Sequence, residues 1–187
     1  IREPINGLTH LVGAIFAFFG LLAMVIKSAY ESHSALQLTA VTIFGISMIL
    51  LYSASATYHM VIAKDKVIAF FRRIDHSMIF ILIAGSHAPF CLISLKGWFG
   101  WTIFSIVCVI ALLGVCFKLI WFSCPRWLST TLYIAMGWII VIATVPLSKA
   151  LSLNGLVLLI IGGILYTIGG FIYAIKPKCL SFNLEHK

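Results

Sequence analysis

The sequence is poor in charged residues. Only 10% of its 187 residues are Asp, Glu, Lys or Arg, and just five of these are acidic, whereas a soluble domain averages about 25% charged residues. Hydrophobic residues make up 62% of the chain, and its mean hydropathy is +1.13. This composition excludes a water-soluble fold, an intrinsically disordered chain and a nucleic-acid-binding domain. The net charge is +8, and the basic residues that produce it lie between long apolar runs. They therefore indicate membrane topology rather than a polyanionic partner.

Paired cysteines are also lacking. The five cysteines form no CxxC motif, and their odd number within apolar segments argues against a disulfide framework. We therefore expect them to fill space among apolar side chains. They are Cys91, Cys108, Cys116, Cys124 and Cys179.

What the sequence does contain is six uninterrupted apolar stretches. A bilayer core about 30 Å thick requires a helix of about 20 apolar residues. Because backbone groups in lipid must be satisfied internally, runs this long indicate helices rather than barrel strands. We predict an all-α fold, a polytopic transmembrane helix bundle forming a single integral-membrane domain over residues 1–187. The predicted spans are 6–27, 36–60, 74–95, 98–121, 127–147 and 154–175.

Proline and glycine refine this prediction. Pro89 lies inside the third span and predicts a kink there. Four glycines of the sixth span recur at a spacing of seven residues, which favours a close-packing face toward a neighbouring helix. These glycines are Gly162, Gly163, Gly169 and Gly170.

The basic residues predict the orientation of the bundle. Ten of the 13 fall in segments that are cytoplasmic if the N-terminus is cytoplasmic, and Lys27, Lys96 and Lys149 fall on the other side. This bias predicts a cytoplasmic N-terminus. The segment Val61–Arg73 mixes basic and apolar residues, and it could be an interfacial helix or a plain cytoplasmic loop. The ten are Arg2, Lys64, Lys66, Arg72, Arg73, Lys118, Arg126, Lys176, Lys178 and Lys187.

Polar side chains of three spans should meet at one depth. Asp75 is the only acidic residue in any predicted span, and ionisable groups in spans are functional candidates. With the N-terminus cytoplasmic, five side chains share one level near the cytoplasmic leaflet. His87 lies 12 residues beyond Asp75, about 18 Å further along the helix, and is assigned no role. The five are His10, Ser55, His59, Asp75 and His76.

Two interpretations of this cluster remain open. Ser55 and His59 are four residues apart, so they share one helix face. His59 with Asp75 is the minimum for a metal site, because imidazole and carboxylate are both metal ligands. A His–Asp hydrogen bond that ties the second span to the third is the alternative. His10 and His76 are expected to form hydrogen bonds between helices rather than to bind metal.

Several ordered motifs resemble one family. They are SATYH (residues 55–59), RRIDHSMIFILIAGSHAPF (72–90), INGLTHLVGA (5–14), LLGVCFKL (112–119) and YIAMGW (133–138). Together they are similar to the haemolysin III family, the bacterial branch of the progestin and adipoQ receptor superfamily.

The resemblance implies a seven-helix fold with a cytoplasmic N-terminus and a zinc site near the cytoplasmic face. It implies His59 as a zinc ligand, Asp75 as the partner of the zinc-bound water, and Ser55 close by. The seventh helix and its HxxxH motif are missing, and the chain starts at Ile1 rather than Met. We therefore expect a fragment in which Zn2+ is incompletely liganded, from a multi-pass protein of the bacterial inner (plasma) membrane.

Three functions are suggested by the resemblance and the residues. The family name implies a cytolysin, although no span has a polar stripe able to line a pore. The related receptors imply a zinc-dependent hydrolase of lipid amide bonds, in which Asp75 is the general base and Ser55 stabilises the transition-state oxygen. The third is a non-enzymatic membrane-homeostasis or receptor-like sensor protein with a structural site. Membrane lipids are the expected partners, and the sequence leaves a homo-oligomer open.

Overall fold

The computed structural model describes residues 1–175, and these residues form helices and connecting turns without a strand. Six helical segments are long and apolar enough to cross a membrane. The predicted all-helical, polytopic bundle is therefore confirmed. The elements are α1 (Pro4–Glu31), α2 (Ala35–Met60), α3 (Asp65–Ala88), the π-helix η1 (Pro89–Leu95), α4 (Gly97–Ile120), α5 (Arg126–Gly137), the 3₁₀ helix η2 (Trp138–Ala143), α6 (Thr144–Ala150) and α7 (Leu153–Ile175). Lys176, Pro177, Lys178, Cys179, His186 and Lys187 lie outside the described residues.

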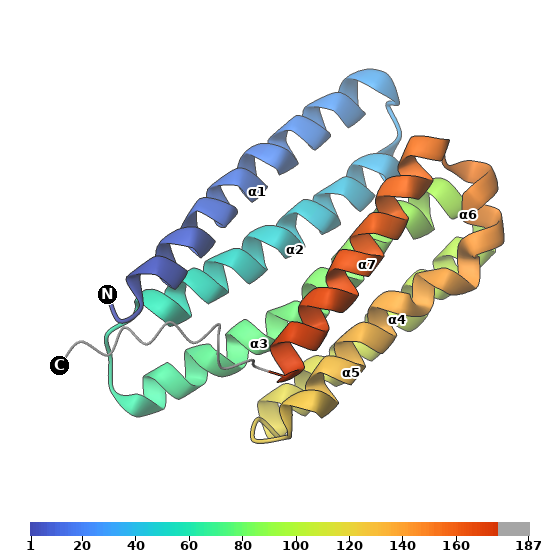
Figure 1. Cartoon of the computed structure of the whole chain (residues 1–187). Coiled ribbons are helices and arrows are strands. Elements are labelled where there is room, and N and C mark those ends of the chain that lie inside the picture. The colour runs from blue at the N-terminus through green and yellow to red at the C-terminus, as the bar shows by residue number, and fades with distance from the viewer. Residues whose placement is uncertain (176–187) are drawn as a thin grey trace.

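Helices that are consecutive in the chain pack on one another. α1 packs on α2, α2 on α3 and α3 on α4, while α7 returns to pack on α5 (Figure 1). The largest buried cluster lies between α3, α4 and α5, with Phe80, Val107 and Met136 at its centre. Large apolar side chains on the outer surfaces of α1, α4 and α7 are exposed, as expected for surfaces that face lipid.

Small residues bring neighbouring helices close together. A Cβ at Gly85 of α3 would overlap Ser47 of α2, and a Cβ at Gly114 of α4 would overlap the Phe80 ring of α3. Lipid chains are as apolar as leucine, so helix association in a bilayer depends on such close van der Waals packing. These two glycines therefore set the spacing of α2, α3 and α4.

The predicted glycine face of the sixth span, α7, is only partly correct. A Cβ at Gly170 would lie 2.9 Å from Ile134 Cδ1 of α5, so this glycine does permit a close contact. Gly162, Gly163 and Gly169 have no described atom within 4 Å of the corresponding position. The seven-residue spacing therefore marks one contact in the described structure rather than a continuous interface.

The third span begins earlier than predicted. α3 starts at Asp65 rather than at residue 74, and it runs without a break into the span. Residues 65–73 are therefore neither a plain loop nor a separate interfacial helix. Asp65 lies in the first turn, where its negative charge interacts favourably with the helix dipole. At the other end, the α-helix gives way at Pro89 to the π-helix η1.

The fifth span is interrupted, which we did not predict. Residues 126–150 form α5, the 3₁₀ helix η2 and α6 in succession. Pro146 has no N–H to donate to the carbonyl of Ile142, and its ring crowds that carbonyl. The preceding turns tighten to 3₁₀ geometry, a common response to lost α-helical hydrogen bonds.

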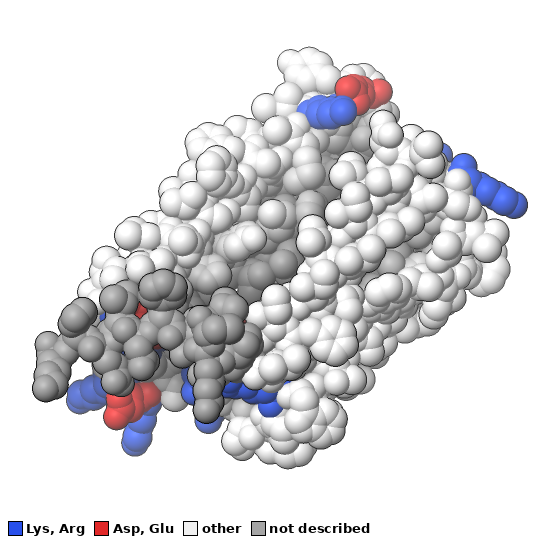
Figure 2. Space-filling view, in the orientation of Figure 1, with Lys and Arg blue, Asp and Glu red and all other residues white. Residues whose placement is uncertain are grey.

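Charged side chains gather at the two ends of the bundle, and the long middle of the surface shown in Figure 2 carries none. We call the end where α1 begins, α2 ends, α3 begins and α4 joins α5 the basic end (Figure 1). Its described basic residues are Arg2, Lys64, Lys66, Arg72, Arg73, Lys118 and Arg126. The opposite end carries Lys27, Lys96 and Lys149. By the positive-inside rule, the basic end is the expected cytoplasmic end.

Candidate functional site

The candidate site lies at the basic end, where the start of the chain meets the end of α2. The backbone N–H of Glu3 donates a hydrogen bond to the carbonyl of His59, at 3.0 Å. This bond joins residues 56 positions apart and holds the first turn of α1 beside the last turn of α2. The predicted residues of the first three spans therefore lie near one end of the bundle.

The imidazole of His59 is held by a carboxylate. His59 Nδ1 donates to Glu3 Oε2 at 2.8 Å, and the Asn6 side chain donates to the same oxygen at 2.9 Å. The His59 side chain is 17% exposed. When the imidazole is neutral, a carboxylate at Nδ1 selects the tautomer whose lone pair is on Nε2. That nitrogen is the atom through which His59 could bind a metal ion.

Glu3 is ionised at neutral pH. Partial burial acts to raise the pKa of its carboxyl group, but hydrogen bonds from Asn6 and His59 and the charges of His59 and Arg2 outweigh this effect. The pKa of Glu3 therefore lies below its ordinary value of 4.5. An ionised carboxylate only accepts hydrogen bonds, which assigns the donor role to His59 Nδ1.

Arg2 fastens the same segment to α2. Its guanidinium donates to the carbonyl of Tyr58 at 2.8 Å, and its Cζ lies 4.5 Å from the centroid of the Tyr58 ring. Arg2 Nη2 also lies 3.4 Å from Glu3 Oε1. The last carbonyls of a helix have no partner within the helix and carry partial negative charge. Arg2 satisfies one of them, so Arg2 and Glu3 together cap the end of α2.

His10 joins this group by stacking. Its ring lies 5.5 Å from the ring of His59 at an interplanar angle of 8°. Its described contact with α2 is therefore a stack rather than the hydrogen bond we expected. Ser55 is buried one turn before His59 on α2. The structure thus brings His10, His59 and Glu3 together at the interface of α1 and α2, and buries Ser55 one turn away on α2.

Asp75 and His76 have other neighbours. Asp75 Oδ2 lies 3.5 Å from His76 Nδ1, and this nitrogen also donates to the carbonyl of Arg72 at 2.9 Å. The bond from the His76 ring is therefore within α3, rather than between helices as expected. The ring lies edge-on to Phe122, 5.4 Å away, and 6.5 Å from Tyr173 of α7. The described hydrogen bond of the His59 ring is to Glu3, not to Asp75.

A zinc ion fits one part of this donor set. His59 has a free ring nitrogen and a carboxylate behind it, which is the usual arrangement of a metal-binding histidine. A catalytic zinc needs three protein ligands and a water. Within residues 1–175, no three His, Cys, Asp or Glu side chains come together as a metal site. The described residues therefore supply a prepared ligand but not a complete zinc site.

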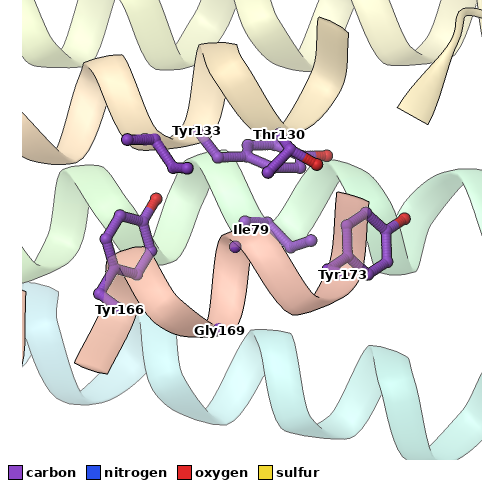
Figure 3. A pocket seen from close by; sticks show the side chains of 8 residues that line it. Ile79, Thr130, Tyr133, Tyr166, Gly169 and Tyr173 are labelled. Atoms are coloured by element: carbon purple, nitrogen blue, oxygen red, sulfur yellow. The ribbon is translucent and has the colours of Figure 1, made fainter. Parts of the chain in front are cut away.

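An apolar pocket of about 270 Å³ lies between α3, α5 and α7. Figure 3 shows Thr130 and Tyr133 of α5 along one edge of it, with Ile79 of α3 between Tyr166 and Tyr173 of α7. The Tyr133 hydroxyl donates to the backbone carbonyl of His76 at 3.0 Å, which connects this pocket to the polar residues of α3. The lining suits hydrocarbon chains better than a polar ligand.

Sequence reasoning did not identify Glu3. It precedes the first apolar run, so a search for ionisable residues within spans passes over it. The available signal was local: an acidic residue, a proline and then Asn6 at the start of a helix. His87, which we assigned no role, is buried, and its Nδ1 donates to the carbonyl of Ile83 within α3.

The fold and the site define a polytopic, all-helical membrane protein with a polar cluster at its basic end. Residues 1–184 match the family described as Haemolysin-III related, and the chain belongs to this family.

Two relatives are similar over most of the chain. Hemolysin-3 of Bacillus cereus is 40% identical over 167 residues, which cover 88% of this chain and 74% of that protein. The Hemolysin-3 homolog of Bacillus subtilis (strain 168) is 41% identical over 165 residues, covering 88% and 76%. No solved structure matches the chain.

Proposed function

We propose that this haemolysin-III-related protein is a zinc-dependent hydrolase of amide-linked lipids in the bacterial plasma membrane. The observation that supports the proposal is the hydrogen bond from His59 Nδ1 to Glu3, because it leaves Nε2 free to bind the metal. The further ligands that zinc requires would lie outside residues 1–175. When bound, zinc would supply a Lewis acid and a water of lowered pKa.

The residues of this chain have distinct roles in the proposal. His59 is the zinc ligand, and Glu3 holds its ring in place. Asp75 is the proton acceptor at the reacting water, and Ser55 donates a hydrogen bond to the developing oxyanion. The apolar pocket between α3, α5 and α7 supports a lipid substrate, because it offers hydrocarbon chains a place beside His76.

Metal analysis tests the zinc ligand. The protein that includes the further ligands outside residues 1–175 is expected to bind zinc saturably, and His59→Ala should remove this binding. His33→Ala is the matched control, because His33 is an exposed histidine at the opposite end of the bundle. Equal zinc binding by all three proteins, or none by the unsubstituted protein with its further ligands present, would contradict the proposal.

Lipid turnover tests the enzyme. Asp75→Asn should abolish fatty-acid release from an amide lipid in reconstituted membranes, with folding unchanged. Asp65→Asn is the matched control, since Asp65 lies on the same helix but only at its first turn. Release that is unaffected by Asp75→Asn would remove Asp75 from the mechanism.

A non-enzymatic sensor or membrane-homeostasis protein is the second candidate. His59 is hydrogen-bonded to Glu3 and stacked on His10, and these two contacts tie α1 to α2. Such a self-contained cluster suits a structural site. This alternative predicts that His59→Ala lowers thermal stability, while neither zinc binding nor lipid turnover is detected in any variant.

The names of the two relatives suggest cytolysis as a further candidate function. It predicts that the purified protein releases dye from liposomes, with empty liposomes as the control. The described surfaces of α1, α4 and α7 are covered with large apolar side chains, which suit contact with lipid better than the wall of an aqueous pore. Liposomes that stay sealed at high protein loading would rule this activity out.

A further inference from the structure

A second pocket at the basic end is lined by cations. It has a volume of about 280 Å³ and lies where α3, the end of α4, the start of α5 and the end of α7 meet. None of its nine described lining residues is acidic, whereas three are Lys or Arg. The cations are Arg72, Lys118 and Arg126. Ser123 and Ser129 contribute hydroxyl groups, and the Phe122 ring lies beside the cations.

Lys118 is the most unusual of these residues, because only 3% of it is exposed. Its ammonium donates to the hydroxyl of Ser129 at 2.5 Å and to Cys124 Sγ at 3.3 Å, and it lies 5.6 Å from the centroid of the Phe122 ring. These partners are neutral. Removing an ammonium from water is costly unless an opposite charge compensates it. Among the described ion pairs, none involves Lys118.

Two arginines complete the positive field. Arg72 Cζ lies 5.0 Å from the centroid of the Phe122 ring, so this ring positions both Arg72 and Lys118. Arg126 is the first residue of α5, a helix of 12 residues whose N-cap residue, Pro125, provides no side-chain cap. The backbone N–H groups at that helix N-terminus add partial positive charge. The carboxylate of Asp75 lies beside His76 at the edge of this group.

The positive-inside rule does not account for this arrangement. That rule requires basic residues on the cytoplasmic side, but it does not require them to be buried or to face one another. Arg73 and Lys64 satisfy the rule while exposed and outside the pocket. Lys118, by contrast, is drawn into the protein, and cations from three helices line one cavity.

We propose that this pocket binds a phosphate-bearing anion. Guanidinium, ammonium and hydroxyl donors that converge on one cavity are the chemistry that recognises a phosphate group, and the nearby Asp75 carboxylate does not line that cavity. The group could belong to the headgroup of an anionic phospholipid, since the basic end is the expected level of the inner headgroups, or to a soluble phosphate. None of the lining residues is Glu3, Ser55, His59 or Asp75, so the phosphate site does not require the proposed hydrolase, although Asp75 lies at its edge.

The test uses the whole chain with three matched variants. Arg72→Gln and Arg126→Gln each remove one charge from the pocket, and Arg73→Gln removes one charge from the same membrane face outside it. Protein in detergent is titrated with radiolabelled inorganic phosphate. In a second arm, the protein is reconstituted in nanodiscs of mixed phosphatidylglycerol and phosphatidylcholine. It is then released from the nanodiscs, and the lipids that stay bound to it are identified by native mass spectrometry.

Each pocket variant should weaken binding of the phosphate group about tenfold, because charged hydrogen bonds are lost. Arg73→Gln should bind like the unsubstituted chain. Retained phosphatidylglycerol that inorganic phosphate does not displace would identify a lipid headgroup. Saturable binding of inorganic phosphate with the same variant pattern would identify a soluble ligand.

Two results would overturn the proposal. One is the absence of bound phosphate or enriched phosphatidylglycerol in the unsubstituted chain. The other is a loss of binding in Arg73→Gln as large as in Arg72→Gln and Arg126→Gln, which would show a diffuse surface charge effect. Both arginines of the pocket are exposed, so their variants should fold even if a substitution of buried Lys118 does not.

Discussion

Glu3 and His59 form a hydrogen-bonded pair across the interface of α1 and α2, with 2.8 Å between Oε2 and Nδ1. The hydrogen bond occupies Nδ1 of the His59 ring and leaves Nε2 available to bind a metal ion. Arg2 and the backbone N–H of Glu3 bind the neighbouring carbonyls of α2, so the pair belongs to a short segment that is fixed at several points. Substitutions in this segment should therefore affect both metal binding and the end of α2.

Glu3→Gln should weaken zinc binding by about 10- to 100-fold, because the carboxylate behind a metal-binding histidine sets its tautomer and basicity. Isothermal titration with zinc measures this change. Glu31→Gln is the matched control, since Glu31 lies at the opposite end of α1 and pairs with Lys27. Equal affinities of Glu3→Gln and the unsubstituted chain would show that Glu3 does not support a metal ligand.

The contribution of Glu3 to stability should depend on pH. Its pKa in the folded protein is lowered below 4.5, so its stabilising contribution is fully present above this value. It should be lost as the pH falls through the lower folded-state pKa. Thermal unfolding of the unsubstituted chain and Glu3→Gln should therefore differ at pH 6, and the difference should shrink as the pH falls below 4.5. A difference that grows on acidification would contradict the assignment of an ionised Glu3.

Arg2→Gln should lower the free energy of unfolding by about 1–2 kcal/mol, because the charged hydrogen bond to the carbonyl of Tyr58 is lost. Amide hydrogen exchange should rise in the last turn of α2. Arg73→Gln removes the same charge from an exposed position and should change neither quantity. Unaltered exchange in Arg2→Gln would mean that Arg2 does not cap the helix.

Gly114→Ala should destabilise the bundle by about 1–3 kcal/mol, since the added methyl group would overlap the Phe80 ring and force α3 and α4 apart. Gly162→Ala is the control, because its methyl group would meet no described atom within 4 Å. Unfolding in detergent compares the two variants. Similar stabilities would show that Gly114 is not at a close contact.

The membrane spans were predictable because a span depends mainly on the length and hydropathy of one continuous stretch of sequence. A run of apolar residues long enough for the bilayer marks a helix, and the observed bounds of α2, α4 and α7 lie within one residue of the predicted ones. The start of α3 was not predictable in this way, because residues 65–73 mix charged and apolar side chains. The interruption of the fifth span depends on a lost backbone hydrogen bond at Pro146, which hydropathy does not report.

The candidate site was less predictable than the spans. The sequence placed His59 at the correct end of the bundle, because depth follows from position along a helix. It could not identify Glu3 as the partner, since that contact depends on how α1 and α2 are rotated and where the preceding residues run. For Lys118, the sequence showed a charge but not its burial, which arises from the approach of α4 to α5.

The packing of consecutive helices has a consequence for biosynthesis. α1, α2, α3 and α4 each contact the helix made immediately before or after them. Each can therefore dock on its predecessor soon after it leaves the translocon, without waiting for distant parts of the chain. α7 differs, because its partner α5 is separated from it by η2 and α6. Ribosome stalling before α7 should thus leave an inserted four-helix unit that already resists protease.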